Sequence, residues 1–325
     1  MGKYVLKRII IMIPILICIC FIVQILIAIA PGDPARSMVG PEAEEWEYEA
    51  IREQLGLNKP MLVRYWDFMK GVFTGNLGVS FFTKRPVWDD LMTRFPYTVM
   101  IATLSVLLAV VVGIPLGIFA ATNQFTWKDS FSVLLSLITV SMPSFWFALL
   151  LVQFFSVKLR ILPVSGIATW KGYILPVASI ALGYAASIMR QMRSNMLEVI
   201  RQDYIVTARA KGLNERKVLY KHALKNALIP VVMTIGVFYG MALGGALIAE
   251  TIYSLPGLGS YTLSGLSNRD YPIIQGSVLF MSVIFVVIML LIDVAFSFID
   301  PRIRSQYVRK RRSVSVKEGM DSGTA

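Results

Sequence analysis

The run Ile9–Ala30 reads IIIMIPILICICFIVQILIAIA, 22 residues without a charged side chain. An α-helix rises about 1.5 Å per residue, so about 20 apolar residues cross the ~30 Å hydrocarbon core of a bilayer. Lys7 and Arg8 precede the run, as cations do in a secretory signal peptide. The apolar core is longer than the roughly 7–15 residues of such a peptide, and Pro31 follows it directly. The run therefore predicts a retained transmembrane helix.

Five more apolar blocks follow along the chain. They are Thr98–Ala121, Phe131–Ser156, Tyr173–Met189 (the shortest), Ile229–Glu250 and Ile274–Ile299. Composition agrees, because 56% of the 325 residues are hydrophobic and 16% are charged, against about 45–50% and about 25% in soluble domains. Lipid cannot satisfy free backbone amides, so such blocks cross a membrane as helices. We expect an all-α integral membrane protein with six transmembrane helices.

The distribution of cations predicts the orientation. With the N-terminus in the cytoplasm, 20 of the 32 Lys and Arg residues fall in inner segments, and inner loops are the basic ones. Both termini are then cytoplasmic, and the net charge of +12 indicates contact with anionic lipid rather than nucleic acid. The chain divides into the N-terminus with the first helix (1–30), an extracytoplasmic cap (31–97), a five-helix core (98–308) and a basic, disordered tail (309–325).

The motifs of enzymes and ATPases are missing from the sequence. We find no P-loop, no metal-ligand spacing around the single histidine, His222, and no nucleophile or zinc-protease motif. Two acids lie near the ends of spans: Glu250, which can be solvated or can cap the following turn, and Asp293, which can pair with an inner-face arginine. We expect a chain that is not an enzyme and holds no cofactor, with energy entering through a partner.

The loop 190–227 within the core has an ordered pattern. Apolar residues from Met196 to Tyr204 recur at helical steps, which extends the fourth helix. Gly212 is a helix-ending residue and Asn214 a favoured N-cap. A short basic helix then runs toward Pro230, which we expect to start the fifth span. The pattern predicts a rigid elbow.

Two interpretations of this elbow remain open. It is either a surface helix with its basic side on phospholipid, or a knob that enters a groove on a soluble partner. In the second case, Leu213, Val218 and Leu219 are the expected apolar anchors.

The cap and the last outer loop are also patterned. Glu42–Leu55 and Pro60–Val72 favour helices, which form either a packing lid or a ligand-contacting surface. In the last outer loop, Pro256 and Gly257 predict a tight turn.

The elbow resembles a known family. The run Thr207–Pro230, TARAKGLNERKVLYKHALKNALIP, is similar to the inner-loop signature of binding-protein-dependent ABC importer permeases, in the version of the dipeptide/oligopeptide/nickel branch. Val206 stands where the general signature has Glu, and His222 and Lys225 stand where it has Ile and Pro, while Leu224 keeps its Leu. Other phrases resemble the first, "B-type" permease of a pair: PGDPA (31–35), LGLNKP (55–60), GNLGVS (75–80), ETIYSLPGLG (250–259) and DPRI (300–303).

This resemblance implies the type I ABC importer permease fold and alternating access. The expected partners are a second homologous permease, two cytoplasmic ATPases that hold ATP and magnesium, an extracytoplasmic solute-binding protein and membrane lipid. The expected ATPase-coupling residues are Thr207, Ala208, Ala210, Lys211, Gly212, Leu213, Asn214, Glu215, Val218 and Leu219. The expected outer gate or binding-protein contacts are Glu250, Tyr253, Pro256, Gly257 and Tyr261.

The cargo stays open among dipeptides, longer peptides, glutathione-like peptides and nickel complexes. Two other classes of function are the alternatives: a stand-alone secondary transporter or channel, and an intramembrane enzyme.

Overall fold

The computed structural model describes residues 2–40 and 42–299. Most of this part of the chain is helical. The α-helices are α1 (Gly2–Ile29), α2 (Pro34–Val39), α3 (Glu45–Gln54), α4 (Met61–Phe73), α5 (Val87–Thr122), α6 (Trp127–Ser141), α7 (Ser144–Leu151), α8 (Ile174–Ile200), α9 (Asp203–Ala210), α10 (Glu215–Lys217), α11 (Leu224–Gly245), α12 (Leu247–Ile252), α13 (Leu258–Asn268) and α14 (Tyr271–Ile299). A 3₁₀ turn spans Trp170–Tyr173, and π-helical turns span Val152–Lys158 and Val218–Ala223.

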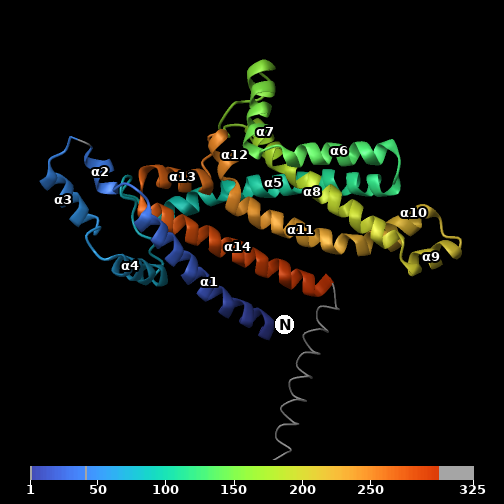
Figure 1. Cartoon of the computed structure of the whole chain (residues 1–325), viewed down its shortest axis with the longest axis horizontal. Coiled ribbons are helices and arrows are strands. Elements are labelled where there is room, and N and C mark those ends of the chain that lie inside the picture. Colours follow the sequence, from blue (N-terminus) through green and yellow to red (C-terminus); the bar gives the residue numbers. More distant parts are fainter. Residues whose placement is uncertain (1, 41, 300–325) are drawn as a thin grey trace, which may run out of the picture.

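The long helices lie roughly along the long axis of the molecule (Figure 1). The cap helices α2–α4 lie at one end, and α9 and α10 lie at the other. Within the described residues, five helices are long and apolar enough to span a membrane, and a sixth span is a bent pair. Counting the bent pair as one span gives the six spans that we predicted. The predicted tail, 309–325, lies outside the described residues.

The third span is not one straight helix. We expected a continuous block over Phe131–Ser156, but α6 ends at Ser141 and α7 begins at Ser144, with a bend of 101° between the two halves. Pro143 explains the break, because proline has no amide hydrogen and pushes the preceding residue out of the α region. Met142 is indeed extended, with φ −80° and ψ 129°. Figure 1 shows α7 projecting sideways from the bundle.

The fourth span, expected to be the shortest, is the most buried of the spans and continues as α8 to Ile200. It packs closely on α5 because two glycines on α5 leave room. A Cβ added at Gly113 would lie 2.7 Å from the carbonyl oxygen of Ala185, and one at Gly117 would lie 2.6 Å from the Cβ of Met192. These two helices form the centre of the fold.

Two other spans begin earlier than expected. The second begins at Val87 rather than Thr98. The fifth does not start at Pro230, which lies inside α11. A helix in a membrane tolerates an internal proline when neighbouring helices bond to the backbone around it. Here the Asn195 amide of α8 donates to the carbonyl oxygen of Ala227, three residues before the proline, at 3.3 Å.

Polar residues in the spans pair with one another. A guanidinium nitrogen of Arg8 lies 2.7 Å from a carboxylate oxygen of Asp293, which confirms the expected ion pair. The Gln275 amide donates to Gln24, which joins α14 to α1. In the cap, both expected helices are present as α3 and α4, and the Tyr65 hydroxyl of α4 donates to a carbonyl oxygen of α1 at 3.1 Å.

Candidate functional site

The elbow, defined here as residues 203–217, follows α8 directly. It consists of α9, a turn at Gly212 and α10. Gly212 has a φ of +75°, and its amide donates to the carbonyl oxygen of Arg209 at 2.9 Å. A left-handed backbone is cheap only for glycine, so this residue ends α9 as predicted.

The chain then restarts as a helix at Asn214. The side chain of Asn214 accepts a hydrogen bond from the amide of Arg216 at 3.0 Å, which confirms the predicted N-cap. Across the turn, the Arg209 guanidinium donates to both carboxylate oxygens of Glu215, at 2.7 and 3.1 Å. The ion pair closes the elbow, and helical backbone continues from α10 through the π-helical turn into α11.

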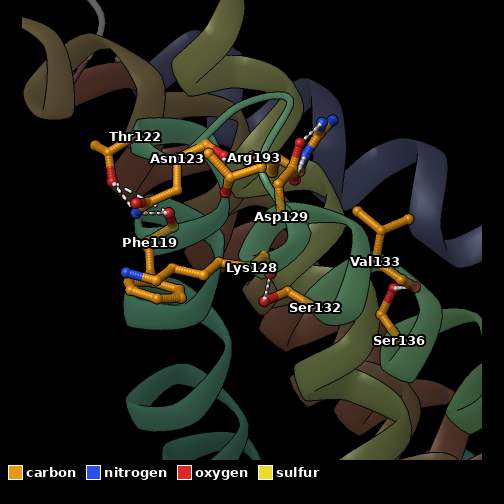
Figure 2. Close-up of polar contacts among 10 residues, drawn as sticks. Phe119, Thr122, Asn123, Lys128, Asp129, Ser132, Val133, Ser136 and Arg193 are labelled. Carbon is orange, nitrogen blue, oxygen red and sulfur yellow. Dashed lines mark hydrogen bonds and ion pairs between the residues drawn. The ribbon is translucent and has the colours of Figure 1, made fainter.

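Buried apolar contacts attach the elbow to the membrane helices. Ile205 of α9 and Val218, just after α10, are both 0% exposed and belong to one cluster with Met192 and Met196 of α8. Arg193 of α8 also donates to both oxygens of Asp129 on α6, each at 2.6 Å (Figure 2). The elbow is therefore packed against α8 and continuous with α11.

The 250–261 segment comprises the end of α12 and the start of α13. It lies away from the elbow, toward the other end of the molecule (Figure 1). Glu250 is 0% exposed. One of its oxygens accepts from the Thr98 hydroxyl at 2.7 Å, and the other accepts from the amide of Ser260 at 3.0 Å. Glu250 therefore caps α13, and Thr98, which also accepts from the amide of Leu258 at 2.9 Å, ties the segment to α5.

Gly257 is required here by space rather than by its backbone angle. Its φ is −97°, but an added Cβ would lie 2.1 Å from the carboxyl carbon of Glu250. The positive φ in this segment, 50°, belongs to Ser254. The expected tight turn is present at Pro256, because the amide of Gly257 donates to the carbonyl oxygen of Leu255 at 2.9 Å. A second turn, which the sequence did not predict, lies at Tyr253–Ser254.

Tyrosines complete the packing of this segment. The Tyr253 hydroxyl donates to the carbonyl oxygen of Ala148 on α7 at 3.2 Å. The Tyr261 hydroxyl donates to Asp90 at 3.2 Å. Burial and the adjacent Asp90 carboxylate raise the pKa of Tyr261, so its hydroxyl stays a proton donor at neutral pH.

A cavity of about 200 Å³ adjoins this segment between α7, α8, α11 and α12. Small side chains line most of it, with Ile180, Tyr184 and Ile248 as the larger exceptions. Its serines are Ser144 and Ser179, and the Ser179 hydroxyl is already bonded to the carbonyl oxygen of Pro176. The cavity therefore presents a smooth wall with few free polar groups.

Comparison with known families and proteins identifies the chain. Residues 113–305 match the family described as "Binding-protein-dependent transport system inner membrane component", and residues 1–102 match its N-terminal component. The chain belongs to this family. It is a permease subunit of an ABC importer, an inner-membrane protein without catalytic activity of its own.

Individual relatives of this permease support the same assignment. It is 38% identical to the "Glutathione transport system permease protein GsiC" of Escherichia coli K12, and 39% identical to that of Salmonella typhimurium LT2. Each match spans 304 residues, 94% of this chain and 99% of the relative. Among solved structures, an inward-facing MetNI methionine ABC transporter matches with a TM-score of 0.57 at 16% identity, over 65% of this chain and 96% of that one, which supports the fold.

The predicted coupling residues of the permease divide by exposure. Six are exposed, namely Thr207, Ala210, Lys211, Gly212, Asn214 and Glu215, while Leu213 and Leu219 are half-buried and Ala208 and Val218 are buried. The expectation that Val218 enters a partner's groove is therefore wrong for this conformation, because it packs inside the chain. Two large apolar side chains that the sequence did not single out as contacts are also exposed, Val206 in the elbow at 54% and Tyr220 just after it at 59%.

The predicted gate residues of the permease are mostly covered. Glu250, Tyr253, Gly257 and Tyr261 are buried, and Pro256 is half-buried. Gly257 packs against the Glu250 carboxylate, whereas Tyr253 and Tyr261 bond to Ala148 and Asp90. Contact with a binding protein or with cargo stays a prediction for these five residues.

Proposed function

We propose that this permease forms half of the translocation pathway of a small-peptide importer and that its elbow couples it to an ATPase. The elbow supports the proposal because it combines an exposed surface with a rigid attachment to α8 and α11. Coupling requires that each state of the ATPase bind one arrangement of the elbow better than the other. The exposed face around Val206 and Tyr220 supplies apolar contacts for such a partner.

The proposed assembly contains this chain, a second homologous permease, two ATPases that hold ATP and magnesium, and a solute-binding protein outside. The proposed orientation has both termini in the cytoplasm. Closure of the ATPases draws the two elbows together and opens the pathway outward. Hydrolysis then reverses the change. No cofactor is proposed on this chain.

The proposed cargo is a di- or oligopeptide or a related small peptide. Relatives that match almost end to end transport glutathione, itself a short peptide, which favours this class over a nickel complex. The smooth cavity beside the 250–261 segment suits a cargo whose identity is checked elsewhere, by the binding protein. Uptake of labelled glutathione, dipeptides and nickel by the whole transporter distinguishes these cargoes.

The coupling proposal is tested by Val206→Asp in the complete transporter, reconstituted in liposomes. Val206 is 54% exposed, so the change should leave folding intact while it weakens ATPase docking and abolishes ATP-driven uptake. Val206→Thr has nearly the same shape and is the matched control, with near-normal uptake. Gly212→Pro, which cannot adopt the φ of +75°, should also abolish uptake.

Co-purification of the ATPase with each variant measures docking separately from transport. Normal uptake with undiminished ATPase binding in Val206→Asp contradicts the docking role of the elbow. Uptake by the isolated chain without ATP would instead support the alternative, a secondary transporter or channel.

A further inference from the structure

A second cavity, of about 350 Å³, opens between α5, α6 and α8. We refer to it as the lateral slot. One continuous face of α6, from Trp127 to Thr139, forms one wall. Apolar side chains dominate the other walls, among them Leu116 and Phe119 of α5 and Met189 of α8.

The hydroxyl groups in the slot are already satisfied. Ser132 donates to the carbonyl oxygen of Lys128 at 2.8 Å, Ser136 to that of Val133 at 2.8 Å, and Thr139 to that of Leu135 at 2.9 Å. Figure 2 shows the first two hydroxyls turned back onto their own helix. The slot thus offers little to a polar ligand and favours hydrocarbon.

The mouth of the slot is cationic and aromatic. Lys128 is exposed, and its ammonium lies 6.0 Å from the centre of the Phe119 ring (Figure 2). The neighbouring acid, Asp129, has both oxygens bound by Arg193, so it does not neutralise Lys128. Phe125 and Trp127 beside it are 88% and 74% exposed, and exposed aromatic residues are typical of a membrane–water interface.

The length of the slot matches one leaflet. Lys128 and Thr139 are eleven residues apart on α6, about 16 Å along the helix, and half of a hydrocarbon core is about 15 Å. The mouth lies at the end of the molecule that carries the elbow (Figure 1). An occupant with a negative head at Lys128 and one chain along α6 fits the charge, the polarity and the length.

We propose that the lateral slot binds one acyl chain of an anionic phospholipid, with the headgroup at Lys128. The site depends on the membrane location of the chain and not on its cargo, so it can fail while the transport proposal stands. The bound lipid would fill the contact between α6 and α8 next to the Asp129–Arg193 pair.

The test uses the complete transporter in nanodiscs that contain phosphatidylglycerol or phosphatidylcholine with a photoreactive group in mid-chain. Mass spectrometry then locates the labelled peptides. We expect labelling of the Trp127–Thr139 face, and loss of most of it in Ser132→Phe, because the ring fills the slot. Lys128→Gln should leave chain labelling in place but lower the preference for phosphatidylglycerol about fivefold.

Lys158→Gln is the matched control. Its ammonium also lies over a phenylalanine ring, 5.9 Å from Phe154, but it is not at the mouth of the slot. It should change neither readout. Equal labelling in Ser132→Phe and the unchanged protein overturns the proposal. So do cross-links from the slot to the second permease in place of lipid, or an equal loss of preference in Lys158→Gln and Lys128→Gln.

Discussion

The elbow and the 250–261 segment make an instructive pair, because both contain residues that motif resemblance marks as functional. Of the eight predicted coupling residues that lie in the elbow, six are exposed, so a partner can reach them directly. In the 250–261 segment, four of the five, Glu250 among them, are buried. Similar motifs can therefore mark either a contact surface or the internal support that holds a loop, and only exposure separates the two.

The strongest test of this contrast is Glu250→Ala. It removes the acceptor of the Thr98 hydroxyl and of the Ser260 amide in a buried site. Each unsatisfied donor costs about 1–3 kcal/mol. The midpoint temperature of thermal unfolding, measured in detergent, should therefore fall by several degrees or more. Glu250→Gln keeps an acceptor oxygen and should lose less. If the stability of Glu250→Ala is unchanged, Glu250 does not stabilise the start of α13 as a cap.

A smaller loss of stability is expected for Gly257→Ala. The added Cβ would overlap the Glu250 carboxyl group, and overpacking of this kind costs about 1–3 kcal/mol. The same unfolding measurement checks it. Gly183→Ala is the matched control, since a Cβ there meets nothing within 4 Å and alanine favours a helix. If both variants are equally stable, the steric explanation is wrong.

The smallest stability change is expected for Gly212→Ala. A Cβ at Gly212 also meets nothing within 4 Å, so the cost arises only from the left-handed backbone, about 1 kcal/mol. Gly212→Asn, which tolerates this conformation better, should lose less. Unfolding and uptake measured together would sharpen the contrast, because the elbow variant should affect coupling more than stability. If Gly212→Ala lost more stability than Gly257→Ala, the expected order of the two variants would be wrong.

The local pattern predicted the geometry of the elbow, namely its turn and its N-cap. Gly212 and Asn214 were identifiable because a helix end depends on a few adjacent residues. Which valine is exposed could not be predicted, because Val206 and Val218 have the same side chain, yet Val206 is 54% exposed and Val218 is buried. The helical spacing of α9 and the short α10 does not reveal which face is buried.

The sequence alone determined the six spans, the elbow and the family resemblance, because apolar length, capping residues and motifs are properties of contiguous chain. The tertiary structure decided which predicted residues are accessible, how sharply the third span bends at Pro143, and that α8 lies at the centre against Gly113 and Gly117. These features depend on contacts between segments far apart in the chain. Burial is set by the neighbours that the fold brings together, and no local pattern specifies them.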